Sequence, residues 1–345
     1  MAPVRPEAEE EGDDRLNGRA GGRVVITGAA GFVGNHVVER FLRDGWSVVA
    51  LVRPGGSAPR PQEAVQIVER DLTRPDALVD VLRGGDVVVH LAGRAHVMHE
   101  RASDPLAAFR AANVAPIEML CDAAARAGVA RLVFMSSSKV FGEGRERPYT
   151  LADPVAPAEP YAQSKAEAER VVTRAGTSGS LDWTILRPPF VYGRGGKGNF
   201  PRLVALARLS SVVPLPLASI ANRRSIVFVG NLADLILHVA RHPKASGRVV
   251  LPTDAEDVST PELIRAIAAA IGSRARLFRF PRGVLRTAAR LVGRSAEMDR
   301  LTESLRLDSR HLRDELEWQP PFTLERALAL SVDASRARSH SEAHA

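Results

Sequence analysis

The stretch VVITGAAGFVG, residues 24–34, decides the fold. An apolar, β-branched run typical of a buried strand leads directly into a turn that carries Gly28, Gly31 and Gly34, and a helical pattern follows. Glycines at this spacing, GxxGxxG rather than GxGxxG, permit a tight turn, close approach of the backbone to a pyrophosphate, and close helix–strand packing. The N-terminus of the following helix adds free N–H groups and a positive dipole end. The stretch therefore predicts a dinucleotide-binding βα unit.

The same alternation of strand and helix continues to residue 187. Short apolar runs typical of strands occupy residues 24–27, 47–52, 65–68, 86–91, 131–136 and 183–187. The helical patterns between them occupy residues 32–43, 75–83, 104–127 and 161–175. Continuous apolar strands alternating with helices predict a parallel sheet covered on both faces. Since such crossovers are right-handed, we expect an α/β fold with a Rossmann-type doubly wound parallel sheet.

The chain divides into two expected domains and two tails. Residues 22–187 are predicted to form an NAD(P)-binding Rossmann domain. Residues 188–333 are expected to form mainly a smaller C-terminal α/β domain that binds the substrate, with some return to the Rossmann sheet. Residues 1–21 are polar and acidic, and residues 334–345 are polar, so both are predicted to be disordered.

Residues 188–230 break the rhythm because they are rich in proline and glycine. We expect loops there, of the kind that often carries function. Helices are expected again at 231–242 and 261–271. The second has a clear start, because Ser259 and Glu262 fit a capping box ahead of it.

Composition excludes several classes of protein. Of the 345 residues, 45% are hydrophobic, so the chain has enough apolar residues for a core. Although 25% are charged, the net charge is only +7, which excludes a chain that is disordered throughout. The single cysteine, Cys121, rules out a disulfide scaffold and is expected to be a small buried hydrophobe. No apolar run approaches the roughly 20 residues of a membrane span, and residues 1–21 lack the apolar segment of a signal peptide. A soluble cytoplasmic protein is therefore expected.

The basic residues are unevenly divided, since 47 are present and only four of them are lysine. This excess could indicate a nucleic-acid partner, but no arginine cluster alternates with aromatic residues, so a solvated surface is favoured and no nucleic acid is expected. The stretch 282–294 places arginines at 282, 286, 290 and 294, at helical spacing. Such a stripe could contact an anionic membrane surface, although a solvated helix face is the commoner explanation.

Two positions bear on the choice of cofactor. An acid that would hold an adenosine ribose hydroxyl is missing at the end of the second predicted strand, where Arg53 stands instead. Arginine pairs with a 2′-phosphate, which favours NADP(H) slightly over NAD(H), although Arg53 could equally stack over the adenine. Asp71, after the third strand, could bond the adenine or cap the segment that follows it.

A second chemical signal is YAQSK, residues 161–165, at the start of a predicted helix. Tyr161 and Lys165 share one helix face, and an ammonium near a phenol lowers the tyrosine pKa toward working pH. Serines 136–138 follow a strand, at the carboxyl edge of the sheet where ligands bind. The alternative is an ordinary surface pair on a helix.

Taken together, these motifs resemble the extended short-chain dehydrogenase/reductases, in the NAD-dependent epimerase/dehydratase family that acts on nucleotide sugars. The resemblance covers about residues 23–330. Its pieces are TGAAGFVG (27–34), DL (71–72), HLAG (90–93), Asn113, SSSKVFG (136–142), YAQSK (161–165), LRPPFVYG (186–193), Asn199-Phe200, NRRSIVFVGNLAD (222–234) and RLDSRHLRDELEWQP (306–320).

The resemblance implies roles for individual residues. Tyr161 would be the general acid/base, Lys165 would hold the nicotinamide ribose, and Ser137, or Ser138 if the register shifts, would bond the reacting sugar oxygen. Asn199 and Arg224 would contact the nucleotide diphosphate. Further cofactor contacts would come from Phe32, Val33, Leu72, Leu91, Ala92, Gly93, Pro188 and Val191.

The resemblance also implies an activity at C4 of a UDP-N-acetylhexosamine-type sugar used for cell-surface polysaccharide or O-antigen. A 4-ketoreductase is favoured because of Arg53, and a 4-epimerase with retained NAD is the alternative. A dehydratase is disfavoured because Ser138-Lys139 stand where those enzymes carry an Asp-Glu pair. A non-catalytic dinucleotide sensor is a remote third reading, since such proteins usually lack the Tyr-Lys pair.

Two further expectations concern partners. The helices at 104–127 and 161–175 resemble those that pair relatives into homodimers. His96, His99 and Glu100 do not form an HExxH motif, and no cysteine pair accompanies them, so no metal is expected.

Overall fold

The structure is a computed structural model. It describes residues 21–60, 63–74, 78, 80–94, 103–142, 144–145, 147–177, 179–196, 198–291, 293, 298 and 301–341. The tail predicted for residues 1–21 lies, apart from residue 21, outside this part of the chain. No helix in the described residues is both long enough and apolar enough to cross a membrane.

A seven-stranded sheet forms the centre of the first lobe, and all of its neighbouring strands are parallel. The strand order is β3-β2-β1-β4-β5-β6-β9. The strands are β1 (Arg23–Thr27), β2 (Ser47–Val52), β3 (Gln66–Glu69), β4 (Val87–His90), β5 (Arg131–Met135), β6 (Trp183–Leu186) and β9 (Arg248–Val250). The predicted doubly wound α/β sheet is confirmed, with strand ends that differ from the sequence prediction by at most two residues.

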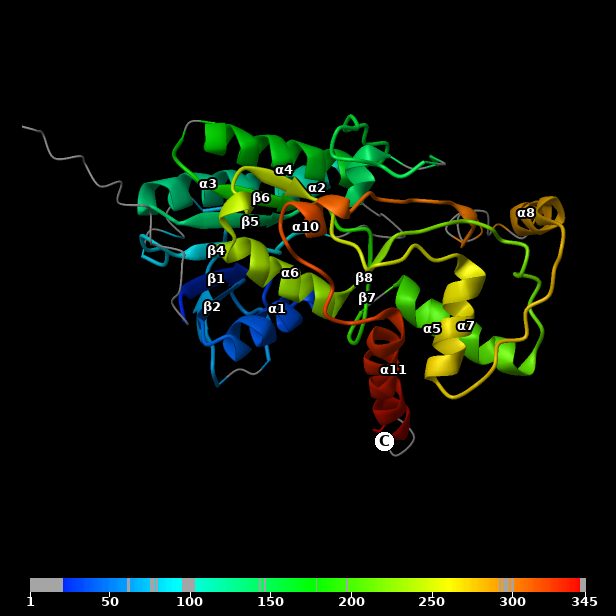
Figure 1. The fold of residues 1–345 in the computed structure, drawn as a ribbon. Helices are drawn as coiled ribbons and strands as arrows, with labels where there is room; N and C mark the ends of the chain where they lie inside the picture. Colours follow the sequence, from blue (N-terminus) through cyan, green and yellow to red (C-terminus); the bar gives the residue numbers. More distant parts are fainter. Residues whose placement is uncertain are drawn as a thin grey trace, which may run out of the picture.

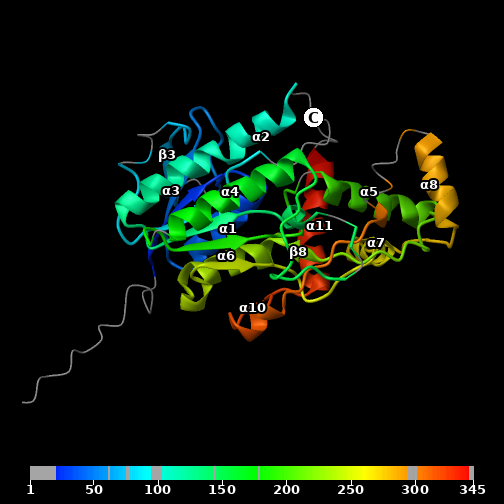
Figure 2. The same cartoon turned by 90° about the horizontal axis from the view of Figure 1, so that it is seen from above.

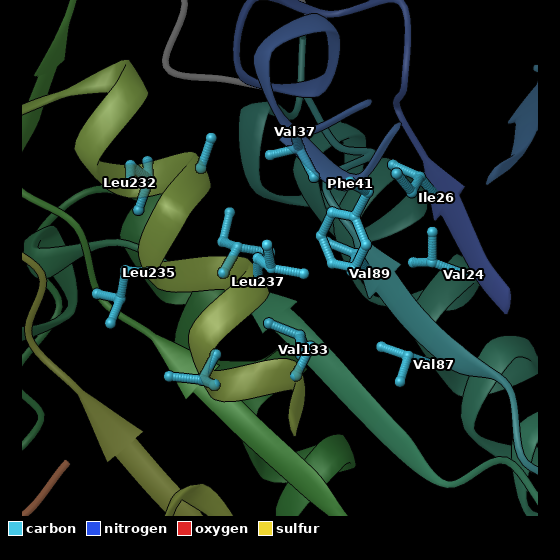
Figure 3. Packing of buried hydrophobic residues seen from close by; sticks show 14 of the residues in the cluster. Val24, Ile26, Val37, Phe41, Val87, Val89, Val133, Leu232, Leu235 and Leu237 are labelled. Carbon is cyan, nitrogen blue, oxygen red and sulfur yellow. The ribbon is translucent and has the colours of Figure 1, made fainter. Parts of the chain in front are cut away.

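Helices cover both faces of this sheet (Figure 1). One face carries α1 (Phe32–Arg43) and α6 (Val229–Arg241), and the other carries α3 (Ala115–Ala127) and α4 (Pro160–Thr177), with α2 (Pro105–Asn113) against α4. Figure 3 shows the first face, where Phe41 of α1 and Leu237 of α6 meet the valines of β1, β4 and β5. Residues buried on both faces explain the continuous apolar strands.

A smaller second lobe extends from the carboxyl edge of the sheet (Figure 2). Its core joins a two-stranded parallel sheet to three helices. These elements are β7 (Phe190–Tyr192), β8 (Ile226–Phe228), α5 (Asn199–Val212), α7 (Thr260–Ala270) and α11 (Leu324–Ser341). The short helices α8 (Arg282–Leu291) and α10 (Arg310–Asp314) complete the chain.

Some elements differ from the sequence prediction. The helix predicted at 104–127 is divided at Val114, because Pro116, in the first turn of α3, has no backbone N–H to continue the hydrogen bonds of α2. Helix α5 lies within the segment expected to be loops. Of the helix predicted at 75–83, residues 75–77 and 79 lie outside the described residues, and residues 78, 80 and 81 form turns. Helix α11 continues to residue 341, beyond the start of the predicted tail.

The topology brings the glycine turn and three loops together at one edge of the sheet. The order of strands reverses between β1 and β4, and Thr27 at the end of β1 lies in register with His90 at the end of β4. Ligands of open parallel sheets bind in the crevice outside the carboxyl ends of the strands at this point. The glycine turn after β1 and the loops after β4, β5 and β6 all begin there.

Candidate active site

The glycine turn has the geometry that a pyrophosphate requires. Gly28 has a φ of +68°, and a Cβ on it would lie 2.6 Å from the backbone nitrogen of Ala92. A Cβ on Gly34 would lie 2.2 Å from the carbonyl oxygen of Gly28. Both positions therefore require glycine, one for the backbone angle and contact, the other for close packing of α1 on the turn.

The N-terminus of α1 is open to an anion. Gly31 is its N-cap and supplies no side-chain cap, and the first turn, which starts at Phe32 and Val33, contains no acidic residue. The first N–H groups of a helix lack partners within the helix and carry positive partial charge. These residues fit the diphosphate of a nicotinamide dinucleotide, which agrees with the sequence prediction.

The loop after β4 is fixed beside this turn. The Thr27 hydroxyl lies 2.9 Å from His90 Nδ1 and accepts a hydrogen bond of 3.1 Å from the backbone of Ala92. Burial, with the charge of Lys165, lowers the pKa of His90 to about 3, so the imidazole is neutral. This agrees with a structural role for His90 and places Leu91, Ala92 and Gly93 against the expected cofactor site.

Tyr161 and Ser137 come together although they lie on different elements. Tyr161 is in the first turn of α4, and Ser137 follows β5, yet the Ser137 hydroxyl lies close enough to the Tyr161 phenol to act on its pKa. The rings of Tyr161 and Phe109 pack edge to face, with centroids 5.8 Å apart. Burial raises the pKa of Tyr161, and the neighbouring Ser137 hydroxyl only partly opposes this. The pKa of Tyr161 is therefore raised in this structure, whereas the sequence predicted that the neighbouring lysine would lower it.

Lys165 lies one turn further along α4 and is buried. Its Nζ donates a 2.9 Å hydrogen bond to the carbonyl of Met135 and stands 5.0 Å from the centroid of the Phe134 ring. Burial lowers its pKa to about 8, against an opposing contribution from Glu169. The ammonium is therefore anchored to the end of β5 in this structure.

Gly93 and Asn113 shape the space around Lys165, through contacts that the sequence did not indicate. A Cβ on Gly93 would lie 2.8 Å from Asn113 Oδ1 and 3.4 Å from Lys165 Nζ. The buried Asn113 accepts a 2.8 Å bond from the backbone of Arg94 and donates a 2.9 Å bond to Ser164 Oγ. Asn113 thus ties the loop after β4 to α4.

A buried polar cluster behind the serine loop was also not foreseen. Glu169 on α4 accepts two bonds from Arg187, of 2.9 and 2.7 Å, and one from the Ser136 hydroxyl. The guanidinium of Arg187 also covers the ring of Phe141, 4.8 Å from its centroid. The cluster joins α4 to the ends of β5 and β6. Only the change from apolar to polar or charged residues at the ends of LVFMSSS (132–138) and TILR (184–187) indicates it in the sequence.

The adenosine end of the site holds the two positions whose roles were left open. Arg53 is exposed at the end of β2. Asp71 accepts hydrogen bonds from the backbone and the hydroxyl of Thr73, which also lower its pKa, so it closes the turn that begins there. Leu72 is half-buried and packs on the core.

The second lobe supplies a mostly apolar pocket of about 140 Å³. Asn199, at the start of α5, and Arg224, which donates a 2.8 Å bond to the carbonyl of Glu303, both line it. The other lining residues are Phe190, Arg202, Leu203, Leu206, Ile226, Val258, Ser259, Thr260, Leu263 and Leu301. The two residues predicted to contact the substrate nucleotide therefore meet at one pocket.

The segment from β6 to β7 connects this pocket to the serine loop. The carbonyl of Pro188 accepts a 2.9 Å bond from the backbone of the buried Ser138. Val191 lies in β7 and packs against both hydrophobic cores. Lys139 makes a 2.8 Å ion pair with Glu159, so the residue after Ser138 is a cation held near the surface.

Cys121 lies apart from this site, in the core of the first lobe. It is buried, and burial raises its pKa to about 12, as expected for a small core residue. His96, His99 and Glu100 lie outside the described residues. Within the residues that the structure describes, no group of three or more potential metal ligands is found.

A Rossmann sheet with a phosphate-binding glycine turn and a Ser-Tyr-Lys set at its carboxyl edge defines an extended short-chain dehydrogenase/reductase. The sequence matches the NAD dependent epimerase/dehydratase family over residues 24–251. The chain belongs to this family, and it is an enzyme of the class that includes nucleotide-sugar epimerases, dehydratases and reductases.

Individual relatives agree with this placement. The chain is 36% identical to a UDP-glucose 4-epimerase of Vibrio cholerae over 315 residues, which are 90% of this chain and 94% of that protein. It is 33% identical to a ceramide reductase of Caulobacter vibrioides, over 79% of this chain and 78% of that one. The fold is similar to that of a Thermotoga maritima UDP-glucose 4-epimerase solved with UDP-glucose, with a TM-score of 0.73 at 19% identity, covering 92% and 99% of the two chains.

Proposed function

We propose that this enzyme transfers a hydride at C4 of a hexose carried on a nucleoside diphosphate, and that it acts as a 4-ketoreductase on a UDP-4-keto-6-deoxy-N-acetylhexosamine. The observation that carries the proposal is that the Ser137 hydroxyl lies beside the Tyr161 phenol, at the carboxyl edge of the sheet and one helical turn from Lys165. A hydroxyl pair of this kind can bind one carbonyl oxygen and give it a proton.

In the proposed reduction, the chain manages the proton and the developing charge. When bound, the nicotinamide supplies the hydride. Tyr161 gives its proton to the C4 oxygen, while Ser137 donates a hydrogen bond that positions this oxygen. The cost of forming a buried phenolate is what raises the pKa of Tyr161, so the charged Lys165 is needed nearby as the phenol ionises. The rest of the fold holds the two reactants in line.

The pocket of the second lobe supports a nucleotide-linked substrate. Apolar walls such as Leu203 and Val258 would hold the base, and Arg224 and Asn199 would contact the diphosphate. A guanidinium suits phosphate oxygens because its N–H groups form a planar fork. The sugar would then extend from this pocket toward Ser137.

Arg53 supports the reductive direction. It stands exposed at the end of β2, where the 2′-position of an adenosine ribose lies in folds of this type. A reductase exchanges its cofactor at every turnover and draws on NADPH, whose 2′-phosphate an arginine would bind.

A 4-epimerase is the second candidate, and the similarity to the Vibrio cholerae UDP-glucose 4-epimerase favours it. An epimerase would use the same Tyr161 and Ser137, first as base and then as acid, on the two faces of the sugar ring. It would retain NAD and show no net redox change. Either enzyme would serve the synthesis of sugars for cell-surface polysaccharide.

One experiment separates these candidates. The purified protein is denatured, and any released cofactor is identified. The enzyme is then given UDP-4-keto-6-deoxy-N-acetylhexosamine with NADPH or NADH, and separately UDP-N-acetylglucosamine without added cofactor. We expect NADPH oxidation in the first assay; inversion at C4 in the second would establish the epimerase instead. Tyr161→Phe should reduce either activity by about 10²- to 10⁴-fold with an unchanged unfolding midpoint, and full activity would refute the site.

A further inference from the structure

One end of the second lobe exposes large apolar side chains. We call this surface the distal face. It comprises Leu209, Val212, Val213, Phe278, Val284 and Leu291, all of them exposed, with Leu291 at 84% and Val212 at 72%. Such exposed clusters mark interaction sites more often than exposed single residues do.

Backbone hydrogen bonds join two segments of the distal face that are far apart in the sequence. The backbone of Phe278 donates a 3.0 Å hydrogen bond to Leu215, and the backbone of Arg276 donates a 2.7 Å bond to Ser210. The end of α5 therefore lies beside the segment that leads into α8. Figures 1 and 2 both show α8 at the extremity of the molecule, on the far side of α5 and α7 from the sheet.

The charge around this face has one sign. Between Glu262 and Glu297 the sequence holds eight arginines and no acidic residue. The side chains of Arg274, Arg276, Arg279 and Arg290 are all exposed. Among the described residues, none of these four arginines forms an ion pair with a carboxylate.

We infer that the distal face binds the surface of an anionic lipid bilayer. Val284 and Leu291 lie seven residues apart on α8, so they project from one side of the helix, where they can enter the boundary between headgroups and acyl chains. The arginines can then contact lipid phosphates at the same depth, and each adds electrostatic attraction to anionic lipids. An apolar ridge bordered by cations is complementary to this surface in both respects.

Two other occupants fit the face less well. A second copy of the chain would bring one arginine-rich surface against another, and like charges repel across an interface. A nucleic acid would bind the arginines through its phosphates, which dominate such binding, and would leave the exposed valine and leucine side chains without a partner. The inference does not depend on the proposed reaction, since none of the distal-face residues lines the pocket or the Ser137–Tyr161 site.

The test is sedimentation of the full chain with vesicles, either of phosphatidylcholine alone or with 30% phosphatidylglycerol. We expect at least tenfold tighter binding to the anionic vesicles in 50 mM salt, and loss of that difference in 0.5 M salt. Val284→Asp/Leu291→Asp should weaken binding at least tenfold. The matched control is Leu151→Asp/Val155→Asp, which alters two exposed apolar residues of the first lobe and should bind as the unaltered chain does.

Folding is checked separately, because all variants should keep the unfolding midpoint and the cofactor affinity of the unaltered chain. The inference is overturned if anionic vesicles are not bound, if neutral vesicles are bound equally, or if Val284→Asp/Leu291→Asp leaves binding unchanged. It is also overturned if that double substitution instead halves the mass in solution, which identifies a second copy. Tighter binding to duplex DNA than to vesicles, unaffected by the double substitution, would point to nucleic acid instead.

Discussion

Gly93 controls how closely the loop after β4 approaches Asn113 and Lys165. An added Cβ would lie 2.8 Å from Asn113 Oδ1, which is closer than real Cβ contacts, and 3.4 Å from Lys165 Nζ. Either the loop or Asn113 must therefore shift beside Lys165, and displacements near 1 Å at a reacting centre can cost about 10²-fold in rate.

Gly93→Ala is therefore expected to lower kcat by about 10- to 100-fold while the fold is retained. Steady-state kinetics and thermal unfolding measure the two effects. Gly84→Ala is the matched control, because its Cβ would meet only ordinary contacts, 3.4 Å from the carbonyl of Ala127. Unchanged kinetics for Gly93→Ala would mean that the loop does not set the position of Lys165.

Lys165 gives the enzyme a predictable dependence on pH. Its pKa in the folded protein is about 8, so the ammonium loses its proton as the pH rises through that value. Because Tyr161 needs this charge as it ionises, kcat/KM is expected to fall above about pH 8, approaching tenfold per pH unit. A flat profile from pH 7 to 10 would contradict this role.

The stability of the protein provides an independent check on Lys165. The folded pKa lies below the usual 10.5, so the unfolded chain binds more protons between about pH 8 and 10.5. The free energy of unfolding, relative to Lys165→Met, should therefore rise with pH across that window. Urea unfolding at several pH values measures the difference.

The sequence was informative about which residues form the site but not about their environment. Tyr161 and Lys165 were proposed from their types and spacing, and Ser137 from the family resemblance, and the structure brings Ser137 beside Tyr161. The direction of the Tyr161 pKa shift could not be predicted, because it depends on burial that only the packed loops create. The close approach of Gly93 to Asn113 and the buried pair of Glu169 with Arg187 were missed for the same reason, since each depends on partners far away in the chain.

At the scale of elements, the Glu169–Arg187 pair fixes α4 against the sheet. Both side chains are less than a tenth exposed, and together with Ser136 they join α4 to the ends of β5 and β6. Breaking one side of a buried pair leaves an uncompensated charge, which typically costs 3–5 kcal/mol. The pair therefore matters through the position it gives α4, the helix that carries Tyr161.

Glu169→Gln is expected to lower the free energy of unfolding by about 3–5 kcal/mol. Glu169→Leu/Arg187→Met should recover at least part of this loss, because it removes both buried charges. Arg110→Ala is the control, since it removes an exposed ion pair between α2 and Glu167 of α4 and should cost no more than about 1 kcal/mol. Equal effects of Glu169→Gln and Arg110→Ala in urea unfolding would refute the distinction.

Helices with clear ends were predictable, and those without were not. The helix predicted at 32–43 matches α1, and the capping box of Ser259 and Glu262 forms as expected ahead of α7. Helix α5 was missed because it has no side-chain cap and no acid in its first turn, and it lies between glycine-rich and proline-rich segments. Its buried residues Phe200, Val204 and Ala207 join the second core, while Leu203 and Leu206 line the pocket, so apolar side chains cover more than one face of the helix.

At the scale of the whole molecule, the late segment of the chain links the two lobes. Trp318 belongs to the core of the first lobe and donates a 2.8 Å bond to Asp234 on α6. The backbone of Phe322 then exchanges two hydrogen bonds with the side chain of Asn231. Beyond it, α11 enters the core of the second lobe. One continuous stretch thus contributes to both cores and holds the substrate pocket against the cofactor edge.

This arrangement predicts different results for two truncations. Removing residues 334–345 should leave the unfolding midpoint unchanged, because Val332 is the last of the described side chains in the second core. Removing residues 324–345 also deletes Ala327, Leu328 and Val332, of which Leu328 and Val332 alone contribute about 1.5–3 kcal/mol each by burial. That loss is comparable to the 5–15 kcal/mol that holds a typical domain together, so the second lobe should unfold and the nucleotide pocket should be lost.

Leu328→Ala keeps this prediction testable if the shorter chain does not fold. It should cost about 2–5 kcal/mol in urea unfolding and weaken nucleotide-sugar binding, while NADPH binding to the first lobe changes little. Equal losses of both ligands would mean that the lobes unfold as one cooperative unit. Full stability of the chain ending at residue 323 would show instead that α11 is dispensable, because the packing of α5 on α7 alone would then hold the pocket in place.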